Sequence, residues 1–193
     1  MKDFSSTPEL DLEIKIHEAF ATVPFPGLLH IAVYSCDNVD PDKTRKRFSD
    51  KTDWTQLDGR FLDESSSDLF FFDAGGLQFF LPAYMTANIS YRFERVELVV
   101  FLTNGLTDRG KVDPIMPGKG RETTCFDFKR SKFSCFTISQ LEAIVAFLTF
   151  MVSAGQEHYA GDVSEAVRNC YQPRILELHE RNLMRAAMTC SQS

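Results

Sequence analysis

Four residues of the chain are of types that could carry catalysis: Asp73, Gln78, Tyr84 and Cys135. A cysteine nucleophile needs a neighbouring base and a lowered pKa. The basic run 129–132 precedes Cys135 and could favour its thiolate. Free cysteine is more often a small buried hydrophobe, and a tyrosine among apolar residues often makes a structural hydrogen bond. These four residues are therefore the candidate site, and a structural role is the leading interpretation.

The histidines and glycines form no motif for a metal, a cofactor or a phosphate group. Neither HExxH nor a zinc spacing of cysteines and histidines is present. Gly75 and Gly76 precede an expected helix without a GxxxxGK[ST] or GxGxxG pattern, and Asp73 would repel an anion there. Close backbone packing is the expected reason for the two glycines. The sequence predicts no metal and no cofactor. The scattered histidines are His17, His30, His158 and His179.

The acidic balance of the chain argues against nucleic acid as a partner. Its 193 residues include 27 acidic and 21 basic side chains, which gives a formal net charge of −6. A protein that binds nucleic acid needs a positive field to displace counterions. The basic run 129–132 does lie among phenylalanines, as in single-strand binders, but we expect those rings to point inward. Protein is therefore the predicted class of partner.

Cysteine usage and hydropathy predict a soluble, cytoplasmic protein without a membrane span. The five cysteines form no CxxC pair and follow no signal peptide, which favours free thiols in a reducing compartment. The longest apolar run, 143–154, is far shorter than the roughly 20 residues that a bilayer requires.

The segment 69–85 concentrates aromatic side chains in few residues. It holds five of the eighteen phenylalanines around a Gly-Gly pair. Phenylalanine has no polar group to hold it at the surface, so this density of rings predicts the centre of a packed core.

Capping signals and helical spacing predict that most of the chain is helical. Thr7 with its following proline begins one helix, Asp73 caps another, and Thr137–Gln140 forms a capping box for a third. Pro82 and Pro173 should kink or interrupt their helices, because proline lacks a backbone N–H. The expected helices are 8–21, 74–90, 138–154 and 163–188, with shorter ones near 41–47 and 54–61.

A few short segments are expected to be strands, so the predicted fold class is α+β and helix-dominated. Residues 28–35 and 69–72 are short apolar runs, and 126–136 suits an irregular hairpin. Residues 96–102 fit helix or strand, and helix is favoured because Gly105 follows at a C′ position.

The chain is expected to form one compact domain over residues 1–193. A polar tail at 1–6 and a frayed tail at 189–193 would flank it. The stretch 107–124, rich in glycine, proline and charge, is the best candidate for a mobile loop.

Four segments occur in an order that points to a known family: Glu18–Phe20, Asp53–Trp54, Phe72–Met85 and Thr137–Leu148. Together they resemble an uncharacterised bacterial family of small domains of unknown function that carry a Leu-Pro-Ala-Tyr segment. The resemblance implies a fold and no mechanism. The Gly-Gly pair and the 107–124 loop depart from the family pattern.

The leading interpretation of function is a non-enzymatic cytoplasmic module that binds another protein, with a regulatory or immunity-like role. The alternative is an enzyme of unknown class with a small polar site near the 73–84 segment. An enzyme should bring convergent polar groups with perturbed pKa values into one place. A binding module should instead present an acidic or apolar surface patch. The sequence leaves the oligomeric state open.

Overall fold

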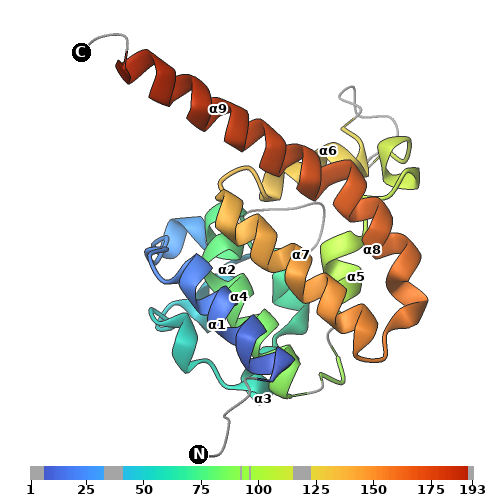
Figure 1. The fold of residues 1–193 in the computed structure, drawn as a ribbon. Helices are drawn as coiled ribbons and strands as arrows, with labels where there is room; N and C mark the ends of the chain where they lie inside the picture. The colour runs from blue at the N-terminus through green and yellow to red at the C-terminus, as the bar shows by residue number, and fades with distance from the viewer. Residues whose placement is uncertain (1–6, 33–40, 92, 96, 115–122, 191–193) are drawn as a thin grey trace, which may run out of the picture. The chain divides into compact units, whose positions relative to one another are not determined.

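The computed structural model describes every residue except 1–6, 33–40, 92, 96, 115–122 and 191–193. Its helices group into two compact units, which are described separately here (Figure 1). The first unit holds residues 1–102 and 131–135, and the second holds residues 103–130 and 136–193.

Helices account for nearly all of the regular structure in both units. The first unit contains α1 (Pro8–Phe20), α2 (Pro41–Phe48), α3 (Gly59–Glu64), α4 (Ala74–Ser90) and, except for its last residue, α5 (Leu98–Thr103). The second contains α6 (Cys125–Lys132) up to residue 130, α7 (Ile138–Ser153), α8 (Ala160–Ala166) and α9 (Gln172–Cys190). Between them lie 3₁₀ turns at Leu28–His30, Trp54–Gln56, Ser66–Phe70, Arg109–Lys111 and Glu157–Tyr159, and a π-helical turn at Val167–Tyr171.

The fold class is all-α, so the prediction of an α+β fold with short strands is wrong. In the described part of the chain no strand is present, and β pairing there is limited to the isolated bridges Ala32–Phe72 and Pro114–Thr124. The apolar runs at 28–30 and 66–70 are 3₁₀ turns. Periodicity cannot distinguish a short buried strand from a buried helical turn, because both are continuous apolar runs.

The hairpin predicted at 126–136 is also wrong, because α6 occupies most of that segment. The Thr124 hydroxyl accepts a hydrogen bond from the Asp127 backbone N–H at 3.0 Å and lies 2.8 Å from the Asp127 carboxylate. A threonine followed three residues later by an acid is a helix-start pattern. This local signal prevails over the irregular spacing of the phenylalanines.

The capping signals placed the other helices well. Thr7 Oγ1 caps α1, and Thr137 with Gln140 forms the predicted capping box at the start of α7. In the 96–102 segment residues 98–102 are helical, as favoured, and Gly105 has the expected positive φ of 81°. Helix α4 matches its predicted bounds and is not broken in two at Pro82.

Some segments discussed from the sequence lie wholly or partly outside the described residues. They are the tail 1–6, the end of the 28–35 segment beyond residue 32, residue 96, residues 115–122 of the predicted mobile loop, and residues 191–193 of the predicted frayed tail, whose residues 189 and 190 belong to α9.

The core of the first unit forms around α4, against which α1 and α3 pack. Phe48, Phe72 and Phe80 are fully buried, and their ring centroids lie 4.8 to 5.1 Å apart in each pair. Phe79 meets Phe80 edge-to-face at 4.9 Å. The aromatic segment is therefore the packed core that its composition predicts.

Gly76 marks the closest backbone approach to α4. A Cβ atom built on Gly76 would lie 2.1 Å from the carbonyl oxygen of Ile31, whereas one built on Gly75 would meet its nearest neighbour at an ordinary 3.4 Å. The backbone N–H of Asp73 donates to the same Ile31 oxygen at 3.2 Å. Close packing therefore explains one glycine of the pair, as expected.

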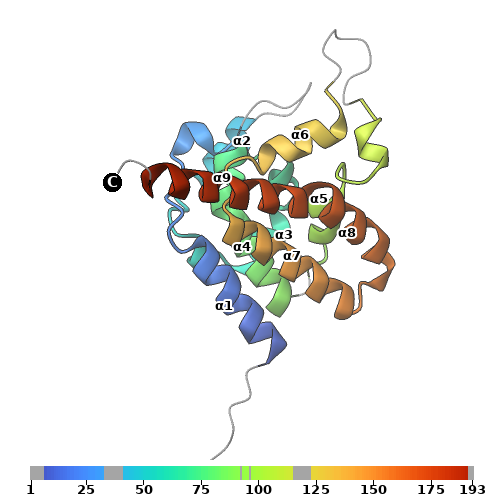
Figure 2. The same ribbon diagram turned by 45° about the horizontal axis from the view of Figure 1, so that its top comes forward.

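The second unit is built on α7, whose buried face includes Leu141, Ile144 and Leu148. Helix α8, the π-helical turn and α9 return along it, and Figure 2 shows this return from a second direction. The predicted interruption at Pro173 is confirmed, because the π-helical turn ends two residues before it. A wider turn accommodates the missing N–H and the proline ring without ending the helix.

Candidate functional site

Three of the four predicted site residues meet at the start of α4, in the first unit. Asp73 Oδ1 caps the helix by accepting from the Gly76 N–H at 2.7 Å. The Cys135 thiol donates to the Ala74 carbonyl oxygen at 3.3 Å, and the Gln78 side-chain amide donates to the Cys135 carbonyl oxygen at 3.0 Å. Residues 131–135 are thereby fixed to the first turn of α4.

The fourth residue, Tyr84, lies deeper in the same helix and outside this cluster. Its hydroxyl donates to the Ser65 carbonyl oxygen at 3.0 Å, and its ring is fully buried. Burial raises the pKa of this phenol well above its usual value, with a further increase from the nearby Asp68 carboxylate. Tyr84 is a neutral hydrogen-bond donor that joins α4 to the end of α3.

The Cys135 thiol is held in its protonated form. Burial raises its pKa, a backbone hydrogen bond acts in the opposite direction, and the Asp73 carboxylate raises it further. The basic run 129–132 does not produce the thiolate that its charge suggested. A thiol that donates its proton to a carbonyl oxygen is a poor nucleophile at neutral pH.

Lys132 is a member of this cluster that the sequence did not single out as a site residue. Its side chain is buried, and its ammonium nitrogen donates to the carbonyl oxygens of Phe70 at 2.7 Å and Phe72 at 2.9 Å. Loss of solvation lowers the pKa of the amine from 10.5 to about 8, although Asp73 acts to raise it. No spacing in the sequence links residue 132 to residues 70–72, so the pairing appears only in the fold.

The lowered pKa of Lys132 predicts how the free energy of unfolding changes with pH. Between pH 8 and 10.5 the unfolded chain holds a proton on this amine that the folded chain has released. The free energy of unfolding therefore rises with pH in that window, by up to about 3 kcal/mol from this group. Relative to Lys132→Met, which cannot titrate, the wild type should gain that amount between pH 7 and pH 10.5 in urea unfolding.

The pKa of Lys132 can also be measured directly by NMR. The lysine side-chain NMR signal of Lys132 should shift with a midpoint near pH 8. A constant stability difference between the two proteins, together with a midpoint near that of free lysine, would contradict the prediction.

Neither a metal site nor a membrane span is found in the described part of the chain. No three His, Cys, Asp or Glu side chains gather there as ligands for an ion. None of the helices in that part combines the length and the apolar composition needed to cross a bilayer.

A second candidate functional feature is a set of exposed apolar side chains on α9, in the second unit. Four large apolar side chains on this helix are between 62% and 71% exposed. At 100° per residue they lie within one half of the helix surface. We call them the apolar stripe: Leu176, Leu183, Met184 and Met188.

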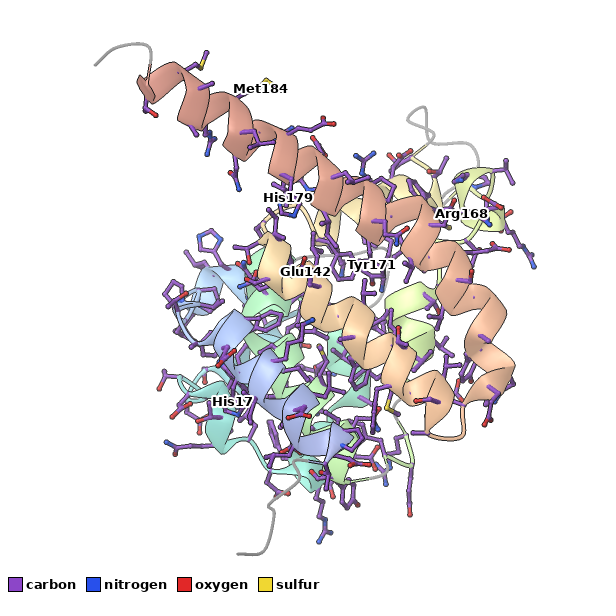
Figure 3. The ribbon with its side chains drawn as sticks, in the orientation of Figure 1. His17, Glu142, Arg168, Tyr171, His179 and Met184 are labelled. Carbon is purple, nitrogen blue, oxygen red and sulfur yellow. The ribbon has the colours of Figure 1, made fainter. Side chains whose placement is uncertain are left out.

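The distal half of α9, residues 181–190, extends beyond the other helices of its unit. Figures 1 and 2 show α9 running past the start of α7, and Figure 3 places Arg168 near the beginning of this long helical run and Met184 near its far end. Every residue from 179 to 189 is exposed. The sequence predicted this helix, but only the structure shows that its apolar side chains are left uncovered.

Charge is arranged unevenly along α9. Glu177, at the centre of an ionic cluster, lies 2.7 Å from Arg174 and also pairs with Arg181, and its pKa is lowered mainly by the Arg174 hydrogen bond. Residues 181–190 contain no acid and two arginines, of which Arg181 pairs with Glu177 of that cluster and Arg185 lies beyond it. The distal half is thus basic as well as apolar.

Comparison with known proteins identifies a family without an assigned activity. A model of a family of unknown function, DUF6714, matches residues 9–175. No curated protein and no solved structure matches significantly. The resemblance to a family of unknown function is confirmed, while a bacterial origin and the Leu-Pro-Ala-Tyr segment as a family feature stay predictions. The match ends at residue 175, before the apolar stripe, which begins at Leu176.

Proposed function

We propose that this chain, which belongs to the DUF6714 family, is a protein-interaction module whose binding element is the distal half of α9. The observation that carries the proposal is the exposure of the apolar stripe, most of which lies on the distal half of α9, where every residue from 181 to 189 is exposed. An amphipathic helix that offers apolar anchors at helical spacing is a recurring mode of protein recognition.

The energetic argument rests on what the stripe leaves in water. Fully burying one leucine or methionine side chain contributes about 1.5–3 kcal/mol. The four side chains of the stripe therefore hold several kilocalories per mole that folding of the second unit does not use. A partner that covers them would gain this contribution on binding, less the cost of association.

The charges on the distal half indicate the chemistry of the partner. Arg181 and Arg185 lie beside the stripe with no acid among residues 181–190. A matching surface would be an apolar groove bordered by carboxylates, because complementary charges speed association and exclude wrong partners. The proposed partner is thus a protein with an acidic, apolar groove.

The polar cluster at the start of α4 gives less support to an enzyme. Its Cys135 thiol is protonated and donates to a carbonyl oxygen, and the Lys132 amine donates to two more. Because these side chains already donate hydrogen bonds to backbone carbonyl oxygens, the cluster is better explained by a structural role.

Site-specific photo-crosslinking in the source cell tests the proposal. A photoreactive amino acid at position 184 lies within the stripe, and the same group at position 182 lies on the opposite face of the same exposed turn. We expect protein adducts from position 184 that are absent from position 182. The adducts should weaken when Arg181 and Arg185 are both changed to glutamate.

Two results would count against the proposal. Equal adduct formation from both positions would mean that the helix touches neighbours without a preferred face. A lack of adducts at position 184 would mean that the stripe is simply solvated.

A further inference from the structure

The second unit also carries an apolar groove, formed where α8 and the π-helical turn lie beside α7. Its volume is about 370 Å³. Its apolar lining comes from four valines and an alanine: Val145, Val152, Val163, Val167 and Ala160. Thr149, Ser164, Arg168 and Gln172 supply its polar edge. We call this the α7–α8 groove.

The α7–α8 groove is better suited to side chains than to a polar ligand. Small-molecule sites combine an apolar lining with a few convergent polar groups. Here Thr149 donates to the Val145 carbonyl oxygen of its own helix, and Arg168 pairs with Asp108 at 2.9 Å. The valine surface is therefore the main feature that an occupant would meet.

The segment that forms the groove is acidic. Residues 138–166 contain Glu142, Glu157, Asp162 and Glu165 and no lysine or arginine. Three of these, Glu142, Glu157 and Asp162, are exposed. None of these acids lines the groove, whose one charged lining residue, Arg168, is paired with Asp108. The exposed acids give α7, α8 and the turn between them a negative charge, opposite to that of the distal half of α9.

One chain cannot bring its own stripe into its own groove. Gln172 lines the groove and begins α9, and Leu183 lies eleven residues further along the same helix, roughly 16 Å away at 1.5 Å per residue. The helix would have to break to return. A second copy of the chain has no such restriction.

We infer that the distal half of α9 docks into the α7–α8 groove of a second copy of this chain, and that the exchange is reciprocal. This inference rests on the proposed function and gives the partner a definite identity. A reciprocal exchange closes into a two-fold dimer, in which the same contact is formed twice. Doubling the contact also brings the buried area of a single helix closer to the roughly 1,200 Å² of a stable interface.

Mass measurement of the purified chain tests the inference directly. The wild type should have twice the mass of one chain by light scattering or sedimentation. Met184→Glu in the stripe should weaken the dimer about thirtyfold or more, as loss of a central interface residue does. Thr149→Arg, which places a bulky positive charge at the exposed edge of the groove, should have a similar effect, whereas Asn182→Glu on the opposite face of α9 should not.

Mixing the two disruptive variants gives a sharper result. In a mixed pair, the intact stripe of the Thr149→Arg chain faces the intact groove of the Met184→Glu chain. One of the two contacts is restored, so the mixture should associate more strongly than either variant alone. No such recovery is expected if the stripes pair with each other.

The outcomes separate this inference from the proposed function. A monomeric wild type up to millimolar concentration, together with a position-184 adduct of some other mass in cells, overturns the second-copy inference and leaves the interaction module standing. A dimer that is insensitive to Met184→Glu, or that is lost with Met184→Glu but kept with Thr149→Arg, also overturns it. A monomer that gives no adduct overturns both.

Discussion

Replacing Gly76 with alanine is expected to destabilise the first unit by about 3 kcal/mol or more. The added Cβ would lie 2.1 Å from the Ile31 carbonyl oxygen, which is a backbone atom and cannot rotate away. Overpacking typically costs 1–3 kcal/mol, and a contact this short against backbone lies at or beyond the upper end of that range. To relieve this contact, α4 would have to move away from Ile31, which directly follows the 3₁₀ turn Leu28–His30.

The neighbouring glycine provides a matched control for that prediction. At Gly75 the added Cβ would meet its nearest atom, in Pro26, at 3.4 Å, and the position is helical. Gly75→Ala should therefore be neutral or stabilising by up to about 1 kcal/mol, because alanine loses less entropy in a helix. Urea unfolding of both variants checks the pair. Equal effects at the two positions would show that the Gly76 contact is not tight.

Replacing Phe80 with alanine is expected to cost about 3–5 kcal/mol, the range for a buried phenylalanine. Phe80 is fully buried, and its ring meets those of Phe48, Phe72 and Phe79 within 5.1 Å. Truncation would leave a cavity among rings that belong to separate parts of the unit. The surrounding rings cannot all collapse into it, so most of the cost should remain.

Phe70 is the natural comparison for Phe80. It is 52% exposed and has an edge-to-face contact with Phe101 at 5.3 Å. Because about half of its surface is already in water, Phe70→Ala should cost less than half as much as Phe80→Ala. A loss below about 1 kcal/mol for Phe80→Ala, in thermal or urea unfolding, would place that ring outside the core.

The sequence predicted those parts of the fold that local chemistry decides. Thr7, Asp73 and the Thr137–Gln140 box begin their helices as expected, because a capping side chain bonds to an N–H two or three residues away. Pro173 disturbs its helix for an equally local reason, the missing N–H. The aromatic core was predictable because its rings are clustered in sequence.

The errors arose where distant segments decide the outcome. The runs at 28–30 and 66–70 are 3₁₀ turns, and no sequence pattern says whether such a run finds a strand beside it. The meeting of Cys135 with Ala74 joins residues 61 positions apart. Lys132 belongs to the basic run 129–132, but its side chain is buried and donates to the carbonyl oxygens of residues 70 and 72.

The exposure of the apolar stripe on α9 also could not be predicted from the sequence. Helical spacing predicts that the apolar side chains of α9 share a face, but it cannot say whether anything covers that face. An amphipathic helix usually turns such a face to the core of its own domain. Its exposure here is information that only the fold contains.

The π-helical turn at Val167–Tyr171 sets the rotational phase of everything that follows it. A wider turn places one more residue in the same stretch of helix than an α-helical turn does. Each residue advances the helix by about 100°, so the direction in which Leu183 and Met184 point is fixed upstream, at the turn, and not by the sequence of α9 itself. Loss of a single residue between 167 and 171 would rotate the whole stripe by that angle while leaving its composition unchanged. The face that α9 presents to a partner therefore depends on the number of residues in the π-helical turn. Two relatives with identical α9 sequences that differ by one residue in that turn would present faces about 100° apart.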